Sequence, residues 1–191
     1  MIKKLPNFLS KDELKLAQQY WSLKEYSLTP CFQAQNSFSL YADFLSETFM
    51  VAKKDQVEKA LGEPLLSAYS FSRVYYYASK LLVHHDRPSC EVSISLNIDA
   101  DLEWPLWFHE LGEDEKPLQG QEACPLTLKP GEACLYEGFK YDHWRETYKG
   151  KRCMQVFLHY VRKNGNYTSF AKDGRQHFGQ SALESSKEVW K

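Results

Sequence analysis

The most constraining feature of this sequence is a series of short β-rich runs that begins near Ser70 and ends near Val161. They are separated by turns rich in Gly, Pro, Asp and Lys. In order they read RVYYYAS, KLLVHHD, EVSISLNI, WPLWFHE, CPLTL, ACLYEGF and CMQVFLHYV. Runs of this length and spacing predict a β-barrel or β-sandwich. The segment KPGEA at 129–133 also predicts a tight turn that makes CPLTL and ACLYEG antiparallel neighbours.

Two helices are predicted before these strands. Ser10 and Glu13 have the spacing of a capping box, which favours a helix over 11–23. A second apolar stripe favours a helix over 43–61 that ends at Gly62 and Pro64. The predicted class is therefore mainly β with flanking N-terminal helices, an α+β arrangement.

The length of 191 residues predicts one domain. We expect this domain to occupy residues 1–165, with helical support over 1–65 and the β core over 66–165. Residues 166–191 form a polar extension without periodicity, in which Phe170, Phe178 and Trp190 are candidates for docking onto the domain.

The composition argues against a nucleic-acid partner. Lys and Arg number 24 against 25 Asp and Glu, so no overall field attracts a nucleic acid or an acidic membrane. The five cysteines are an odd number without CxxC spacing, which favours free thiols in a reducing compartment. There is no apolar leader or membrane-spanning stretch, so the expected location is cytoplasmic.

A candidate metal site lies in the run KLLVHHD. His84 and Asp86 are two residues apart in a predicted strand and share one face, whereas His85 points the other way. A second imidazole from a later strand, His143, completes two histidines and one carboxylate, the facial triad typical of non-haem iron(II). A structural zinc site would instead favour four protein ligands, often thiolates.

A cation near this site would bind the distal carboxylate of a dicarboxylate co-substrate. Arg152 lies nine residues after His143 and begins the strand RCMQVFLHYV. Its guanidinium group can bind a carboxylate bidentately. Arg152 is the preferred anchor, and Arg73, Arg87 and Arg145 are alternatives. The strand's alternation puts one set of side chains on a common face, namely Arg152, Met154, Val156, Leu158 and Tyr160.

These motifs together resemble the prolyl-4-hydroxylase-like branch of the 2-oxoglutarate- and iron(II)-dependent oxygenases. The resemblance rests on HHD at 84–86, KPGEACLYEG at 129–138, HWRE at 143–146 and the strand from Arg152, and it covers roughly residues 66–160. It implies a double-stranded β-helix, or jelly-roll, barrel with helices packed outside. It also implies an HxD…H iron triad, with a basic anchor nine or ten residues after the distal histidine.

The same resemblance implies a dioxygenase that hydroxylates a C–H bond of a peptidyl, amino-acid or small-metabolite substrate. The implied cofactors are Fe(II), 2-oxoglutarate as co-substrate and O2, and ascorbate is compatible with them. Further co-substrate contacts would come from Tyr75, Tyr77 and Ser95. Some relatives carry a second tyrosine at the place of Ser95, and serine reaches less far. The candidate substrate contacts are Arg145, Arg87 and Trp144.

Two other classes stay open on the sequence alone. One is a non-catalytic β-helix module that binds a small ligand or a partner surface. The other is a cupin-type metalloenzyme without a keto-acid co-substrate, which has no need of Arg152 near the metal. The substrate and the oligomeric state are not determined by the sequence, because specificity in such folds lies in the loops around the barrel mouth.

Overall fold

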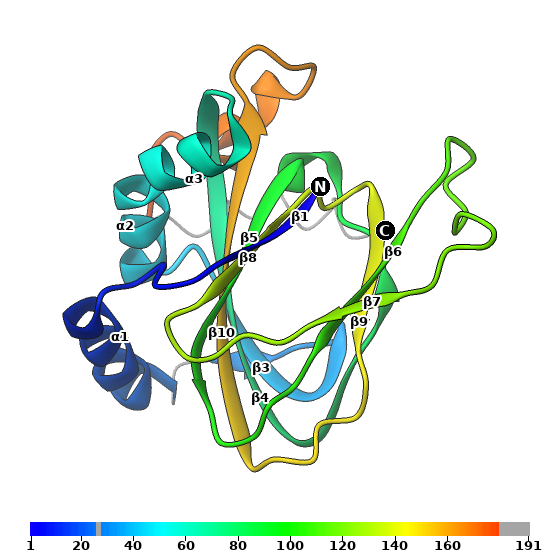
Figure 1. Cartoon of the computed structure of the whole chain (residues 1–191). Coiled ribbons are helices and arrows are strands. Elements are labelled where there is room, and N and C mark those ends of the chain that lie inside the picture. The colour runs from blue at the N-terminus through cyan, green and yellow to red at the C-terminus, as the bar shows by residue number, and fades with distance from the viewer. Residues whose placement is uncertain (26–27, 180–191) are drawn as a thin grey trace.

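A computed structural model describes residues 1–25 and 28–179 of the chain. Antiparallel strands form one ten-stranded sheet that rolls into a nearly closed barrel, and the helices lie on one side of it (Figure 1). The strands are β1 (Ile2–Leu5), β2 (Thr29–Pro30), β3 (Ala34–Tyr41), β4 (Leu65–His84), β5 (Val92–Ala100), β6 (Leu106–Glu110), β7 (Cys124–Leu126), β8 (Ala133–Tyr136), β9 (Tyr141–Arg145) and β10 (Arg152–Arg162). The helices are α1 (Lys11–Lys24), α2 (Phe44–Ala52) and α3 (Lys54–Leu61), with short 3₁₀ helices η2 (Pro88–Cys90) and η3 (Thr168–Gly174).

The strand order is β1-β8-β5-β10-β4-β9-β6-β7, with β3 also paired to β4 and β2 paired to β3. Strands distant in sequence are therefore neighbours, as a double-stranded β-helix requires. The long strand β4 pairs with β10, β3 and β9 along different parts of its length. The predicted double-stranded β-helix is confirmed.

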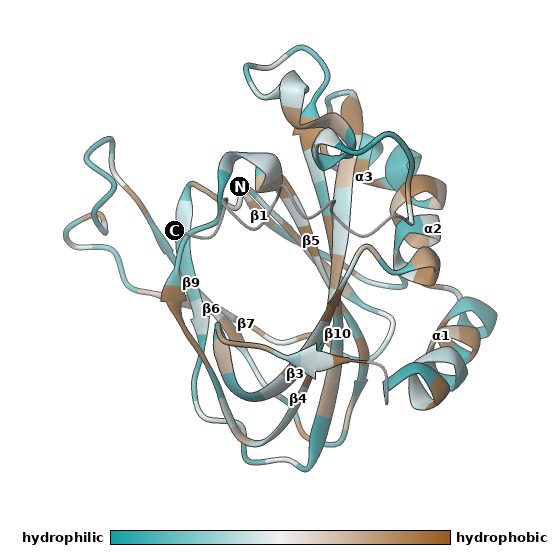
Figure 2. Ribbon diagram, turned by 180° about the vertical axis from the view of Figure 1, so that it is seen from behind, coloured by the Kyte–Doolittle hydropathy of each residue, from teal (hydrophilic) through white to brown (hydrophobic). Residues whose placement is uncertain are grey.

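The barrel wall has an outer face under the helices and an inner face. On β10 these faces alternate, as the strand period requires. The outer set is buried in the main hydrophobic core with Trp21, Met50 and Val57 from the helices. This set contains Met154, Val156, Leu158 and Tyr160. The helices carry both hydrophobic and hydrophilic residues (Figure 2). Trp21, Met50 and Val57 are buried against the sheet, whereas Leu16, Phe44 and Val51 are exposed.

The N-terminal third differs in part from its prediction. Helix α1 has the predicted capping box, in which Ser10 and Glu13 satisfy each other's backbone N–H groups. The second predicted helix is divided at Lys53, whose ψ of 0° interrupts the helical path. The division lets α2 and α3 each bury an apolar face against the curved sheet. This region also contributes strands, since β1 pairs with β8 and β3 with β4.

The predicted pairing of CPLTL with ACLYEG is wrong. The turn itself forms, because Glu132 N–H donates to the Lys129 carbonyl at 2.9 Å and Gly131 adopts a φ of +85°. However, β7 pairs with β6, whereas β8 pairs with β1 and β5. The turn therefore carries the chain from one layer of the barrel to the other.

Part of the C-terminal extension packs against the domain. Phe178 contacts the main hydrophobic core, and buried Arg175 forms an ion pair with buried Glu47 at 2.5 Å. Trp190 lies outside the described residues. Within those residues, we find no helix with the length and apolar character needed to cross a membrane.

Candidate metal centre and cavity

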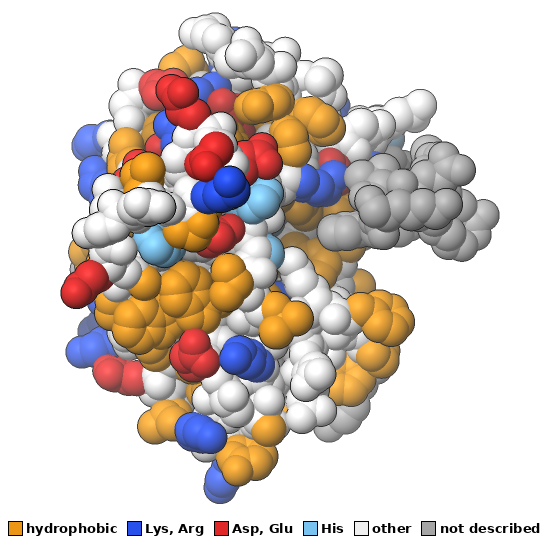
Figure 3. Space-filling model, turned by 90° about the vertical axis from the view of Figure 1, so that its right-hand side faces the viewer, with side chains coloured by type: hydrophobic (Ala, Val, Ile, Leu, Met, Phe, Trp, Pro, Cys, Tyr) orange, Lys and Arg blue, Asp and Glu red, His pale blue; other side chains and the backbone are white. Residues whose placement is uncertain are grey.

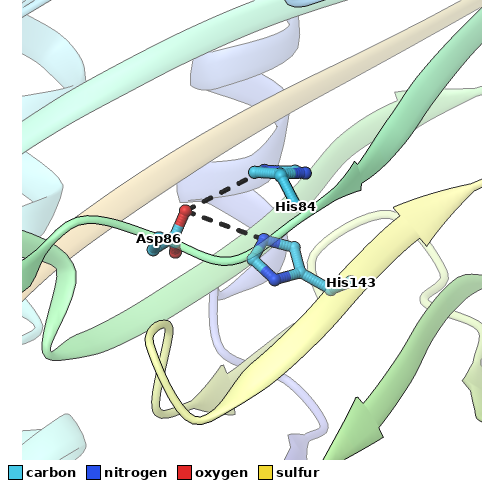
Figure 4. A group of neighbouring side chains, drawn as sticks. All are labelled: His84, Asp86 and His143. Carbon is cyan, nitrogen blue, oxygen red and sulfur yellow. Dashed lines mark ion pairs between the residues drawn. The ribbon is translucent and has the colours of Figure 1, made fainter. Parts of the chain in front are cut away.

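The three predicted metal ligands lie together inside the barrel (Figure 4). His84 ends β4, Asp86 follows in the next loop, and His143 is the register partner of His84 on β9. The Asp86 Oδ1 atom is 3.9 Å from His84 Nε2 and 3.7 Å from His143 Nε2. These separations exceed hydrogen-bond lengths, yet they are short enough for one bound ion to contact all three atoms.

Both histidines are held in one tautomer by the backbone. The Nδ1 atom of His84 lies 2.8 Å from the Leu82 carbonyl, and that of His143 lies 3.1 Å from the Tyr141 carbonyl. A carbonyl only accepts hydrogen bonds, so each Nδ1 carries the proton. Each Nε2 lone pair is therefore free and directed toward Asp86, because the backbone carbonyls behind the rings fix their orientation, as they do for metal-binding histidines.

Burial also keeps these rings neutral. Desolvation lowers the pKa of His84 to about 4, and the neighbouring His143 contributes. Desolvation lowers the pKa of His143 to about 4 as well. Burial raises the pKa of Asp86, because its charged form loses water. A divalent ion would stabilise the charged carboxylate, and the neutral imidazoles can bind it without first losing protons.

The position of Asp86 depends on a close approach by Gly138. The Asp86 N–H donates to the Gly138 carbonyl at 3.0 Å, and Ser93 Oγ donates to Asp86 Oδ2 at 3.4 Å. A Cβ atom at Gly138 would lie 2.4 Å from Asp86 Oδ2 and 2.5 Å from the Cys90 carbonyl oxygen. Only glycine fits at this position without displacing the carboxylate.

The triad lines a cavity of about 340 Å³. Its wall combines aromatic, aliphatic and charged side chains from both layers of the barrel. The lining residues are Gln33, Tyr69, Phe71, Arg73, Leu81, His84, His85, Asp86, Arg87, Cys90, Leu106, Tyr136, His143, Phe157 and His159. The side of the molecule that carries β6 and β9 is hollowed, with histidine side chains near the hollow (Figure 3). The volume is within the range of small-molecule sites.

Arg152 does not reach this cavity. It lies on the outer face of β10, where its guanidinium group forms ion pairs with Glu25 and Asp99, each at 2.7 Å. The residues of β10 that reach the cavity are Phe157 and His159, on the opposite face. Because side chains alternate along a strand, Arg152 and these two residues cannot face the same side.

Of the other predicted co-substrate contacts, Tyr75 and Ser95 are buried, whereas Tyr77 is exposed to solvent. Tyr75 is fully buried, and its hydroxyl accepts from Arg73 Nη1 at 3.0 Å. Tyr77 is 63% exposed; it lies beyond the part of β4 that pairs with β10 and directly precedes Ala78, which has a φ of +66°. Ser95 is buried, and its hydroxyl has no hydrogen-bond partner among the described residues.

Of the predicted substrate contacts, Arg87 lines the cavity and Trp144 does not. Arg87 lines the cavity, forms an ion pair with Asp173 at 2.8 Å and stacks over Tyr69. Trp144 lies on the face of β9 opposite His143 and stacks on Trp107 with ring centroids 6.2 Å apart. It is not among the residues that line the cavity.

Arg145, another predicted substrate contact, is buried and is not among the residues that line the cavity. It is 2% exposed, its Nη1 donates to the Trp104 carbonyl, and its guanidinium group lies over the Trp104 ring. His143 and Arg145 share the buried face of β9, because they are two residues apart. The side chain is therefore directed into the barrel together with the metal ligand.

Sequence reasoning missed several residues at the site. His159 Nδ1 lies 2.9 Å from Ser93 Oγ, and the Tyr69 hydroxyl lies 3.0 Å from Cys90 Sγ. Tyr136 is also buried in the cavity wall. His159 could have been found from the sequence, because strand alternation places Gln155, Phe157 and His159 together on the face of CMQVFLHYV opposite Met154, Val156 and Leu158.

Comparisons with known proteins support the fold. Neither a family model nor a curated protein matches the sequence. A prolyl-4-hydroxylase from Pseudomonas putida has a TM-score of 0.67 at 13% identity, over 85% of this chain and 93% of that one. A 2OG-Fe(II) oxygenase family oxidoreductase from Burkholderia pseudomallei gives 0.66 at 14%, over 86% of each chain.

HygX from Streptomyces hygroscopicus, solved with nickel and 2-oxoglutarate bound, gives a TM-score of 0.63 at 10% identity. That match covers 85% of this chain and 83% of HygX. All three similarities cover 85% or 86% of this chain. The chain therefore has the double-stranded β-helix fold of the iron(II)- and 2-oxoglutarate-dependent oxygenases.

Proposed function

We propose that this protein is an iron(II)- and 2-oxoglutarate-dependent dioxygenase that hydroxylates a C–H bond. The observation that carries the proposal is the arrangement of His84, Asp86 and His143. Two neutral imidazoles present Nε2 lone pairs to one carboxylate at the wall of a cavity of small-molecule size. This donor set suits a borderline divalent ion and leaves coordination positions open toward the cavity.

The donor set fits iron(II) better than a structural zinc ion. A second group, Asp86, Cys90 and His159, also lies close enough to hold a metal. Burial raises the pKa of the Cys90 thiol well above its ordinary value, so the thiolate that a metal needs is disfavoured. This group offers one imidazole, His159, whereas the first group offers two, each oriented by a contact between its Nδ1 atom and a backbone carbonyl. The site with two imidazoles and one carboxylate is therefore the preferred one.

Iron(II) bound with 2-oxoglutarate supplies dioxygen activation, in which one oxygen atom enters succinate as carbon dioxide leaves and the other enters the substrate as a hydroxyl group. The protein's residues perform the remaining tasks. The Leu82 and Tyr141 carbonyls orient the two imidazoles, and Gly138 leaves room for the Asp86 carboxylate. The aromatic wall excludes water from the reacting groups.

The proposed substrate class rests on two structural neighbours and on the size of the cavity. HygX has been solved with hygromycin B bound, and the Pseudomonas putida neighbour is a prolyl-4-hydroxylase. A peptidyl, amino-acid or small-metabolite substrate is consistent with a cavity of about 340 Å³ open to the surface. The near-neutral overall charge of the chain gives no support for a nucleic-acid substrate.

The test is succinate formation from 2-oxoglutarate with iron(II) in air, together with calorimetric measurement of metal binding. We expect His84→Ala, Asp86→Ala and His143→Ala each to abolish turnover and to weaken metal binding by at least about tenfold. His109→Ala is the matched control, since His109 lies on β6 and contacts the Leu118 carbonyl away from the triad. Unchanged turnover in the three triad variants would exclude this centre as the catalytic one.

The same experiment separates the alternative classes. A wild-type protein that binds no divalent ion would favour a non-catalytic binding module. A protein that binds iron(II) at His84, Asp86 and His143 but shows no affinity for 2-oxoglutarate would favour a cupin-type metalloenzyme. Either result would contradict the proposed function.

A further inference from the structure

Cys31 lies in the turn between β2 and β3, and its surroundings differ from those of the other cysteines. It is partly exposed, whereas Cys90, Cys134 and Cys153 are buried. Burial raises the pKa of each of those three thiols, so they stay protonated and unreactive. Cys124 is exposed, but its Sγ atom lies 3.9 Å from the carbonyl oxygen of the next residue, an acceptor that cannot stabilise a thiolate.

Hydrogen-bond donors of the turn are directed at the Cys31 sulfur. The chain reverses direction here, and the Cys31 N–H donates to the Ser37 carbonyl at 2.9 Å. The backbone N–H groups of Gln33 and Ala34 and the hydroxyl of Ser39 then donate to the sulfur. Several donors around one sulfur atom favour its negatively charged form, because a thiolate is a better acceptor than a thiol.

The guanidinium group of Arg73, on β4, is a further donor to Cys31. Arg73 is 4% exposed, and a positive charge is rarely buried at this level without an anion, because its desolvation is costly. Within residues 1–25 and 28–179, no carboxylate lies within ion-pair distance of Arg73, and its Nε atom has no hydrogen-bond partner. It also donates to two neutral groups, the Tyr75 hydroxyl at 3.0 Å and Gln33 Oε1 at 2.6 Å. Arg73 therefore requires an anion, and the Cys31 thiolate is placed to supply it.

The electrostatic balance at this sulfur favours ionisation. Burial opposes the charged form, but the positive charge of Arg73 and the hydrogen bonds of the turn outweigh it, so the pKa of Cys31 lies below its ordinary value. Arg73 is the charged group that faces the sulfur, and Ser39 is neutral. Phe32, the next residue in the turn, is fully exposed, so reagents reach the turn from solvent. A thiolate that solvent can reach is the reactive form of cysteine.

We propose that Cys31 is a modification site, at which hydrogen peroxide oxidises the sulfur reversibly to a sulfenic acid. The thiolate sulfur attacks one peroxide oxygen, so that an S–O bond forms while the O–O bond breaks. The sulfur loses two electrons and the peroxide gains them, and the hydroxide that leaves takes a proton from solvent. One equivalent of a small thiol then forms a mixed disulfide with loss of water, and a second equivalent releases the cysteine. This proposal does not depend on the metal centre.

The first test is alkylation of the full chain by iodoacetamide between pH 6 and pH 9, with each cysteine followed by peptide mass spectrometry. An ordinary thiol is only about 3% ionised at pH 7. We therefore expect Cys31 to react roughly 10-fold faster than Cys124 at pH 7, although Cys124 is the more exposed. The Cys31 rate should also reach its plateau at a lower pH than the rate of an unstructured peptide that contains one cysteine.

Variants of the donors test what holds the thiolate. Arg73→Gln should slow Cys31 alkylation at pH 7 roughly 10-fold, and Arg73→Lys should retain most of the rate, because it keeps the charge. Arg152→Gln is the matched control, since Arg152 pairs with Glu25 and Asp99 on the outer face and should not affect Cys31. Should Arg73→Gln fail to fold, Ser39→Ala replaces it and should slow the reaction by a smaller factor.

The second test is oxidation by equimolar hydrogen peroxide in a chelating buffer, which keeps free iron from reacting with the peroxide. Dimedone, which traps sulfenic acids, should label Cys31 in wild type and in Cys124→Ser, and a small thiol added before dimedone should prevent the labelling. Labelling of Cys124 in preference to Cys31 would overturn the proposal, and so would a Cys31 alkylation rate at pH 7 no higher than that of Cys124. An unchanged rate in Arg73→Gln would refute the role of Arg73.

Discussion

Two buried arginines inside the barrel, Arg73 and Arg145, differ from the arginines outside it in whether a carboxylate compensates their charge. Outside the cavity, Arg162 bridges Glu91 and Glu137, and buried Arg175 meets Glu47. Inside the barrel, no carboxylate among the described residues forms an ion pair with Arg73 or Arg145; Arg73 donates to Tyr75 and also interacts with the Cys31 thiol, and Arg145 donates to the Trp104 carbonyl. A charge paired with a carboxylate needs no further ligand, whereas a buried arginine without one requires another anion to offset its desolvation. The comparison indicates that the outer face stabilises the fold and the inner face is arranged for ligands.

The two faces of β10 test this difference with adjacent residues. Leu158 is fully buried under the helices, whereas Phe157 lines the cavity. We expect Leu158→Ala to lower the free energy of unfolding by about 2–5 kcal/mol, because it leaves a hole in a packed core. Phe157→Ala should cost less, since that ring already borders an open space. Chemical denaturation measures both, and a greater loss at Phe157 would contradict the assignment of roles to the two faces.

Gly138 tests how closely the inner face is arranged around the metal centre. A methyl group there collides with the Asp86 carboxylate and the Cys90 carbonyl. We expect Gly138→Ala to weaken iron(II) binding by roughly 10- to 100-fold, as the loss of a supporting contact around a metal ligand does.

Gly112→Ala is a matched control for this change. A Cβ atom at Gly112 would lie 3.2 Å from side-chain atoms of Asp114 and Leu118 and 3.7 Å from the Lys116 carbonyl oxygen, so it meets no contact as short as those at Gly138. Metal titration of both variants measures the effect. Wild-type affinity in Gly138→Ala would show that Asp86 tolerates displacement.

From the paired charges outside the cavity we expect a smaller, pH-dependent contribution to the free energy of unfolding. Desolvation opposes ionisation of Glu137, but hydrogen bonds from Lys140, the N-terminal amine and Arg162 outweigh it and lower its pKa to about 2. The folded-state pKa is therefore below the ordinary value, so this stability is present above about pH 4.5 and is lost as the pH falls toward 2.

Denaturation measured across this pH range tests the pairing. Each proton taken up on unfolding corresponds to a slope of at most about 1.4 kcal/mol per pH unit. Glu137→Gln should lower stability at neutral pH and flatten the acid dependence. An unchanged profile in that variant would mean that the cluster around Glu137 contributes little to stability.

The fold class was predictable because local patterns survive in the tertiary structure. The capping box at Ser10 and Glu13 begins α1 where predicted, and the short β-rich runs form the barrel. The pairing of strands was harder, because a turn such as 129–133 constrains local direction but not which layer the next strand joins. For that reason β7 and β8 separate after a correctly predicted turn.

The sequence by itself determined the candidate ligands His84, Asp86 and His143, because the chemistry of a metal site restricts both residue type and order. Strand alternation also grouped Arg152 with Leu158 on one face. Only the tertiary structure decided that this face turns toward the helices. Because side chains alternate along a strand, the sequence indicates which residues share a face. The packing of the helices against the sheet decides which of the two faces becomes the interior of the barrel. The same packing buried Arg73 and Arg145 inside the barrel, without a carboxylate partner among the described residues.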